Sequence, residues 1–144
     1  MHKTIQLLFI LIYCSGFSQE NYPFKHGEYL EYKIHYGPIV AGKAILEVDF
    51  EDENYSFNAE GKSTGLFNFF FKVRDYYSST STTDCLCPLY FKRDVSEGNY
   101  KKQESVFFNY PLNRAETTRD TLELPENTQD ILSLFYYLIL NLYY

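Results

Sequence analysis

The chain has 144 residues, which is enough for one domain, and a chain of this size can bury a core without disulfides or metal ions. It carries 13 basic and 19 acidic residues, a formal net charge of −6, and it has no basic run. This balance argues against nucleic acid and anionic membrane surfaces as partners. Tyrosine (15) and phenylalanine (13) are abundant, and aromatic residues favour the half-buried surfaces of β-sheets.

Residues 1–18 are predicted to be a cleaved export signal. A basic start is followed by an apolar run over residues 5–13 that is too short to cross a bilayer. Small residues at Gly16 and Ser18 then suit cleavage after Ser18. We therefore expect a periplasmic protein with a single β-rich domain at residues 19–144 and no transmembrane span once the signal is removed.

A β-hairpin is predicted at residues 28–50. Apolar and polar residues alternate over 28–36 and again over 43–50, which is typical of strands with one buried face. The segment 37–42 between them contains two glycines, Gly37 and Gly42, which can adopt positive φ in a turn. One face of the hairpin is expected to be core, and the other to meet solvent or a cavity.

Further strands are expected along the chain. The predicted segments are residues 55–59, 73–83, 89–95, 100–108 and 114–119. The apolar run 66–71 fits either a buried strand or a short helical turn, because periodicity cannot separate the two. Roughly seven strands with close turns predict an all-β, mainly antiparallel fold, built as a curved sheet or partial β-barrel meander.

The last segment is predicted to be one apolar helix. Asn127 or Thr128 can cap it, and Asp130 would lie in its first turn. Apolar residues cover nearly its whole circumference, so we expect it to pack inside or across the sheet rather than to span a membrane. The chain stops at Tyr144 without a cap or polar tail, which suggests that the domain is incomplete at its C-terminus.

Several motifs follow one another in a fixed order. The first is F-x-x-G-E-x-L-x-Y-x-x-x-Y-G-x-I-x-A-G-x-A, met by Phe24, Gly27, Glu28, Leu30, Tyr32, Tyr36, Gly37, Ile39, Ala41, Gly42 and Ala44. The later ones are residues 71–75, 88–93, 97–100, 129–133 and 136–138. Together they resemble the bacterial envelope family catalogued as domain of unknown function 3108. The resemblance implies an exported β-rich domain that continues with further strands, and it supplies no catalytic residue because the family has no established activity.

Candidate chemistry is sparse. Cys85 and Cys87 could bind a soft metal with a histidine or form a disulfide, but no second cysteine pair completes a site. Incidental turn cysteines are the preferred interpretation, and no metal or cofactor is expected. His35 could act as a base beside Glu31, although no Ser-His-Asp order supports a nucleophile. No catalytic residue is assigned.

An apolar binding surface is the most suggestive hypothesis. Aromatic residues on the strands, including Tyr32, Tyr36 and Phe57, form either ordinary core or the wall of a pocket for a lipid-like ligand. Three Arg-Asp dipeptides place one charge on each side of the sheet, and Arg74 and Arg93 would hold an anionic head group if they faced one cavity.

These features favour a non-enzymatic binding or interaction module of the cell envelope. Its partner would be a lipid-like small molecule or an envelope protein, bound on an apolar concave face. The alternatives are a periplasmic hydrolase that uses His35 and nearby carboxylates, or a purely structural envelope component.

Overall fold

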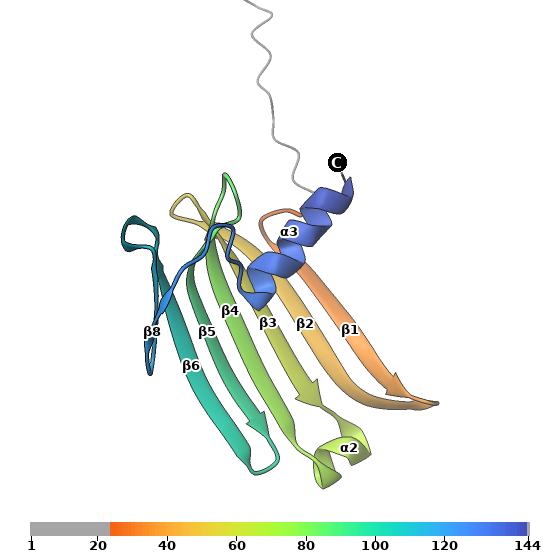
Figure 1. Cartoon of the computed structure of the whole chain (residues 1–144). Helices are drawn as coiled ribbons and strands as arrows, with labels where there is room; N and C mark the ends of the chain where they lie inside the picture. The colour runs from red at the N-terminus through yellow and green to blue at the C-terminus, as the bar shows by residue number, and fades with distance from the viewer. Residues whose placement is uncertain (1–23, 144) are drawn as a thin grey trace, which may run out of the picture.

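The computed structural model describes residues 24–143, with side chains to Leu142; the predicted signal over residues 1–18 lies outside the described residues. Eight antiparallel strands form one sheet in the order in which they occur in the chain (Figure 1). They are β1 (Glu28–Tyr36), β2 (Ile39–Glu51), β3 (Asn54–Ser63), β4 (Val73–Thr82), β5 (Pro88–Glu97), β6 (Tyr100–Asn109), β7 (Arg114–Thr117) and β8 (Thr121–Glu123). The prediction of a mainly antiparallel meander with one C-terminal helix is confirmed. The sheet is open, because β1 and β8 each pair on one side only.

The β1–β2 hairpin has a shorter turn than the sequence predicted. Only Gly37 and Pro38 lie between the strands, and Gly37 has a φ of +59°. Gly42 belongs to β2 instead of the turn, and the pairing shifts by one residue near it. A Cβ atom at Gly42 would lie 2.8 Å from the backbone oxygen of Lys62 on β3. Close strand packing, and not a turn, therefore explains this glycine.

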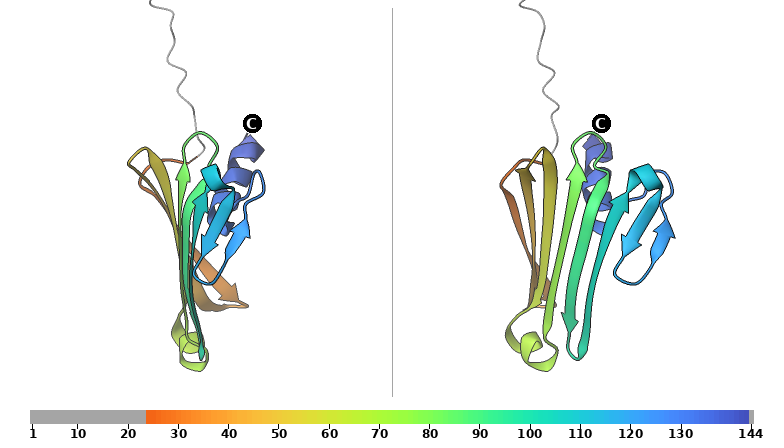
Figure 2. Two further views of the ribbon diagram at one scale, coloured as in Figure 1. Left: turned by 60° about the vertical axis from the view of Figure 1, so that its left-hand side comes forward. Right: turned by 90° about the vertical axis from the view of Figure 1, so that its left-hand side faces the viewer.

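The pairing register separates two faces of the sheet. Val48, Phe57, Ser79 and Phe91 lie opposite one another on β2 to β5, so their side chains share a face. We call this the concave face, because helix α3 (Ile131–Tyr143) and the β7–β8 hairpin both lie on its side in Figure 2 (left). The opposite, convex face carries mostly polar and charged residues.

Helix α3 covers the part of the concave face formed by β3 and β4 (Figure 1). Tyr136 is 1% exposed, and its ring stacks on that of Phe57 with centroids 4.0 Å apart. Phe24 meets the same tyrosine edge-on at 5.2 Å. These three rings are the centre of the main core cluster, and burying each aromatic side chain favours folding by a few kcal/mol, about 1.5–3.

The cap of α3 differs from the prediction. Asp130 is the capping residue: its Oδ1 accepts hydrogen bonds from the backbone nitrogens of Leu132 (2.8 Å) and Ser133 (3.0 Å). Ser133 Oγ in turn accepts from the nitrogen of Asp130 at 2.9 Å, which completes a reciprocal capping box. Thr128, one of the two expected caps, instead donates its hydroxyl to Pro125.

The ambiguous apolar run after β3 is helical. Helix α2 (Gly65–Phe70) connects β3 to β4, and its first residue, Gly65, has a φ of +54°. The preceding residue, Thr64, donates its backbone N–H to Ala41 on β2 at 3.0 Å, which ties the helix to the sheet. Within residues 24–143, no helix is both long and apolar enough to cross a membrane.

Candidate functional site

A groove lies between α2 and the concave side of the four strands β1 to β4. Its volume is about 340 Å³, which is at the lower end of the range for small-molecule sites. The wall is mostly apolar, and it is formed by Ile34, Ala41, Gly42, Gly61, Lys62, Ser63, Phe67, Phe71, Val73 and Asp75. The groove lies at the end of the sheet that α3 does not cover.

Two glycines form the floor of the groove. Glycine is required at position 42, because a Cβ atom there would clash with the backbone oxygen of Lys62. Gly61 on β3 is different, because a Cβ atom there would meet nothing closer than the Cβ of Asp75 at 3.9 Å, an ordinary van der Waals distance. Glycine in a strand interior weakens the strand, and packing does not demand it at this position. The bare backbone of Gly61 therefore keeps the groove open at a cost to the stability of β3.

The roof of the groove is fixed by hydrogen bonds through Ser63. Its Oγ accepts from the backbone nitrogen of Val73 at 2.9 Å and donates to Asn68 of α2 at 3.2 Å. Phe71 packs against Gly98 in the β5–β6 turn, where an added Cβ would lie 2.9 Å from the phenylalanine ring. These contacts hold α2 over the strands, so the groove is preformed.

One charged side chain on the concave side lines the groove: Asp75, which lies directly opposite Gly61 on the neighbouring strand. Asp75 accepts a hydrogen bond from the backbone nitrogen of Ser96 at 3.0 Å, which orients its carboxylate. Burial raises the pKa of the neighbouring Tyr77 above its ordinary value, and the charge of Asp75 adds to this shift. A ligand in the groove would therefore meet a mostly apolar wall with one carboxylate beside Gly61.

The predicted aromatic site residues have different positions. Tyr36 lies at the mouth of the groove, edge-on to Phe67 with centroids 5.9 Å apart. Tyr32 is on the concave side of β1 and is half exposed. Phe57 has no exposed surface, because it lies beneath α3 in the core. Tyr36 and Tyr32 are thus accessible to a ligand, while Phe57 is structural.

The two predicted arginines lie on opposite faces of the sheet. Arg74 is on the convex face, and its guanidinium donates to the backbone oxygens of Ser63 and Val73. Arg93 is on the concave face, where its Nε donates to Glu104 at 2.7 Å. Hydrogen bonds from Lys102 and Arg93 lower the pKa of that glutamate. The arginines therefore do not converge on one anionic head group.

The residues considered for catalysis are not assembled into a reactive centre within the described part of the chain. The side chain of His35 makes no hydrogen bond or ion pair there, and Glu31, four residues earlier on β1, is paired with Lys43 at 2.9 Å. Cys85 and Cys87 are joined in a disulfide. Among residues 24–143, no group of three or more His, Cys, Asp or Glu side chains is placed to hold a metal ion.

A buried polar cluster was not anticipated from the sequence. Ser79 Oγ donates to Oδ2 of Asp130 at 2.6 Å, and Ser81 Oγ lies 3.3 Å from Ser79 Oγ. Burial raises the pKa of Asp130, although the hydrogen bonds that it accepts act in the opposite direction. No histidine touches this cluster among the described residues, so it anchors α3 to β4 and does not activate a nucleophile.

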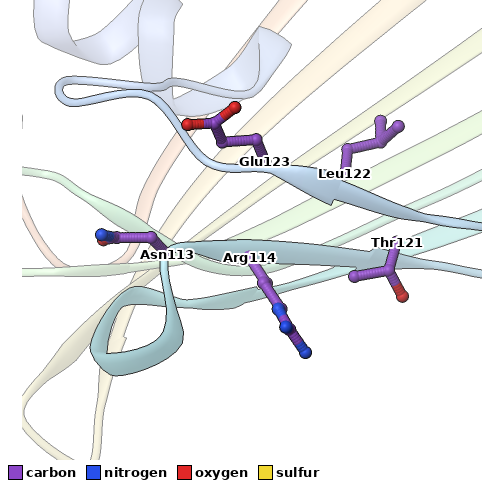
Figure 3. A pocket seen from close by; sticks show the side chains of 5 residues that line it. All are labelled: Asn113, Arg114, Thr121, Leu122 and Glu123. Atoms are coloured by element: carbon purple, nitrogen blue, oxygen red, sulfur yellow. The ribbon is translucent and has the colours of Figure 1, made fainter.

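A second hollow lies beside the β7–β8 hairpin, with a volume of about 420 Å³. Figure 3 shows that its side chains point in different directions, with Arg114 on one side of the hairpin and Glu123 on the other. Binding sites need polar groups that converge on a ligand. The groove beside α2 is therefore the better candidate.

Gly61 and Asp75 are groove residues that the sequence did not single out for a site. The only signal was that Gly61 continues the two-residue spacing of the strand predicted at residues 55–59. In comparisons with known proteins, the family model described as "Protein of unknown function (DUF3108)" matches residues 31–142. Neither the curated proteins nor the solved structures include a match.

Proposed function

This chain belongs to the DUF3108 family of proteins of unknown function, and we propose that it is a non-enzymatic binding module of the bacterial cell envelope. Residues 1–18 direct its export to the periplasm. Its ligand is slender and apolar, such as the acyl chain of a lipid, and it binds in the groove between α2 and strands β1 to β4.

The observation that carries this proposal is the absence of a side chain at Gly61, where there is room for one. Every other feature of the groove is also found in ordinary cores, where apolar side chains fill the available space. Here a strand residue that has room for a side chain lacks one, in the middle of an apolar wall. Such positions are typical of sites where a ligand approaches the backbone closely.

The test is to fill the groove without disturbing the sheet. Gly61→Val adds a β-branched side chain whose Cβ has space, and valine favours strands, so the variant should fold at least as well as the wild type. Ser78→Val is the matched control, since Ser78 lies on the convex face of the neighbouring strand β4 opposite Asn58.

Binding is measured with the apolar dye N-phenyl-1-naphthylamine, whose fluorescence rises in apolar surroundings, and with its displacement by palmitate. We expect wild type and Ser78→Val to bind the dye and release it to palmitate, and Gly61→Val to bind at least ten times more weakly with an unchanged circular dichroism spectrum. Equal binding by Gly61→Val and wild type would refute the groove as the site.

Native mass spectrometry of the protein from its host's envelope tests export separately: a chain that begins at Gln19 supports it, and one that keeps residues 1–18 contradicts it.

A further inference from the structure

One end of the sheet exposes a cluster of large apolar side chains. Phe69 and Phe70 of α2 are 84% and 79% exposed, and Tyr36 in the β1–β2 hairpin is 73% exposed. The remaining members, all exposed, are Ile39, Leu66, Phe71 and Tyr100. The β1–β2 turn, α2 and the β5–β6 turn all lie at this end because the strands are antiparallel and sequential (Figure 1). We call these seven residues the apolar tip. Single exposed apolar residues are common, but a contiguous group marks an interaction site.

A row of cations crosses the convex face directly behind the apolar tip. The register aligns Lys33 with Lys43, Lys43 with Lys62, Lys62 with Arg74, Arg74 with Ser96, and Ser96 with Lys101. Five of these six positions are basic, and each lies within four residues of a strand end at the tip, so the row is about 3 to 13 Å behind it. We call it the cation row.

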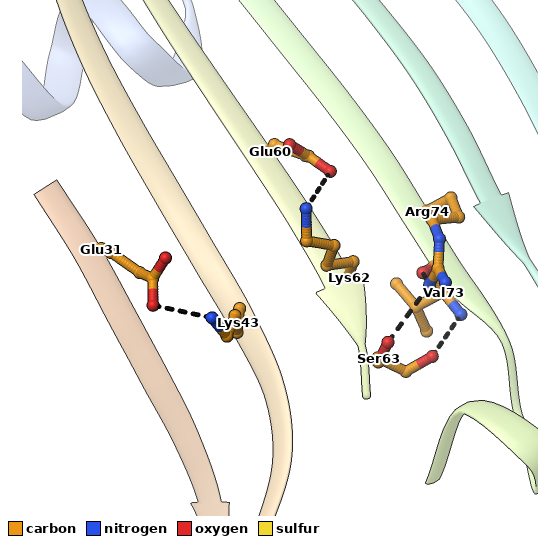
Figure 4. A network of polar contacts seen from close by, with 7 residues as sticks. All are labelled: Glu31, Lys43, Glu60, Lys62, Ser63, Val73 and Arg74. Atoms are coloured by element: carbon orange, nitrogen blue, oxygen red, sulfur yellow. Dashed lines mark hydrogen bonds and ion pairs between the residues drawn. The ribbon is translucent and has the colours of Figure 1, made fainter. Parts of the chain in front are cut away.

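Like charges directly opposite each other on neighbouring strands are destabilising, so this row works against folding unless another group compensates for it. Figure 4 shows the compensation within the protein: Lys43 pairs with Glu31 at 2.9 Å, and Lys62 pairs with Glu60 at 2.9 Å. No carboxylate lies within ion-pair distance of Lys33, Arg74 or Lys101 among the described residues. The charges of Lys33 and Lys101 therefore remain available to an external anion, whereas the guanidinium of Arg74 already donates to two backbone oxygens.

Acidic residues gather at the opposite end of the sheet. Glu51, Asp52 and Glu53 lie at the β2–β3 turn, and Asp84 lies in the β4–β5 loop. A ten-residue strand separates the two ends by about 30 Å, while charges are screened beyond about 8 Å at physiological ionic strength. The negative net charge, which argued against anionic surfaces at the level of composition, therefore does not oppose binding at the cationic end.

We propose that the apolar tip and the cation row together dock this protein on the surface of an anionic lipid bilayer. The aromatic side chains enter the boundary between head groups and acyl chains, and the cations behind them meet the lipid phosphates. A second copy of the chain fits less well, because pairing two tips would bring two cation rows together. The apolar tip borders the groove, since Phe71 lines it and Tyr36 lies at its mouth. The proposal concerns the exposed surface of the tip, and it holds whether or not the groove binds a ligand.

The test uses the mature full chain and sedimentation with vesicles of phosphatidylcholine, with and without 30% phosphatidylglycerol. Lys33→Gln/Lys101→Gln removes two charges of the row, and Phe69→Ser/Phe70→Ser removes the two most exposed rings of α2. All four side chains are exposed, so the variants should fold, which circular dichroism checks. The matched control, Lys92→Gln/Arg119→Gln, removes two exposed cations outside the row.

We expect binding to vesicles that contain phosphatidylglycerol and little binding to neutral ones. Each basic residue near an anionic surface changes the partition constant about fivefold, so the double lysine variant should bind about 25-fold more weakly. The phenylalanine variant should bind these vesicles at least tenfold more weakly than the wild type, and the control should bind as tightly as the wild type. In 0.5 M salt, the difference between the lysine variant and the wild type should disappear.

Equal binding to neutral and anionic vesicles, or an equal loss in the control, would overturn the proposal. Failure of the wild-type protein to bind vesicles would overturn it as well. In that case, a dimer in size-exclusion chromatography that is lost in Phe69→Ser/Phe70→Ser would show that the tip binds a second copy of the chain instead. Dye binding in the groove should be unchanged in the lysine variant, which separates failure of this proposal from failure of the proposed function.

Discussion

Replacing Asp130 by alanine should detach α3 from the sheet. The substitution removes the oxygen that caps the backbone nitrogens of Leu132 and Ser133, and it also removes the acceptor for the hydroxyl of Ser79, which is 1% exposed. The Asp130→Asn variant keeps a side-chain amide in the same place, so it can still cap the helix and pair with Ser79.

The expected magnitude follows from these contacts. Loss of an N-cap costs about 0.5 to 2 kcal/mol, and a buried hydroxyl without a partner costs about 1 to 3 kcal/mol. Asp130→Ala should therefore lower the free energy of unfolding by about 1.5 to 5 kcal/mol, a large part of the roughly 5 to 15 kcal/mol of a typical domain. Thr128→Ala, at one of the caps expected from sequence, should cost less than about 1 kcal/mol, because it removes a single exposed hydrogen bond.

Urea denaturation monitored by far-UV circular dichroism measures these differences. With a slope of about 2 kcal/mol/M, Asp130→Ala should lower the midpoint by about 0.8 to 2.5 M. The reasoning is refuted if Asp130→Ala unfolds at the same urea concentration as the wild type, or if Thr128→Ala is the more damaging change. An Asp130→Asn variant as unstable as the alanine variant would show that the charge, and not the hydrogen bonds, anchors the helix.

Two further predictions concern the same core. Burial raises the pKa of Asp130 in the folded state, so the folded protein binds this proton more tightly than the unfolded chain does. The contribution of Asp130 to stability is therefore greatest below its unfolded pKa, and it falls as the pH rises through the folded pKa. The urea midpoint of Asp130→Asn, relative to that of the wild type, should therefore be higher at pH 7 than at pH 3.5. A relative midpoint that is higher at pH 3.5 would contradict this direction. Tyr136→Phe removes a buried hydroxyl that has no hydrogen-bond partner among the described residues, so thermal unfolding should show a stability that is unchanged or higher by up to about 1 to 2 kcal/mol. Tyr136→Ala removes the whole ring and should lower the stability by about 3 to 5 kcal/mol. A clear loss of stability in Tyr136→Phe would reveal a hidden partner of the hydroxyl.

The strands were predictable because the information for them is local. Alternation over residues 28–36 and 43–50 specified both the hairpin and the faces of its side chains, since the period of a strand is two residues. The role of Gly42 was not predictable in this way. Whether it belongs to a turn or a strand is decided by its contact with Lys62, which lies on the next strand.

The groove and the cation row depend on register, which a single sequence does not reveal. Lys33, Lys62 and Lys101 are far apart in the chain, and they lie in one row only because each hairpin has a particular turn length. The cap of α3 was missed for a related reason. Asp130 is a good cap in any sequence, but its preference over Thr128 comes from the hydroxyl of Ser79 on β4.

The sequential strand order also has a consequence for folding. Each strand from β2 onward pairs with the strand that precedes it, so a chain that emerges from its N-terminus meets a partner already in place at every step. The core is different, because Phe57 and its neighbours stay uncovered until Tyr136 has been synthesised. During that interval the nascent sheet exposes aromatic side chains that favour aggregation, so we expect chaperone dependence to be greatest just before helix α3 is synthesised and to fall once it docks.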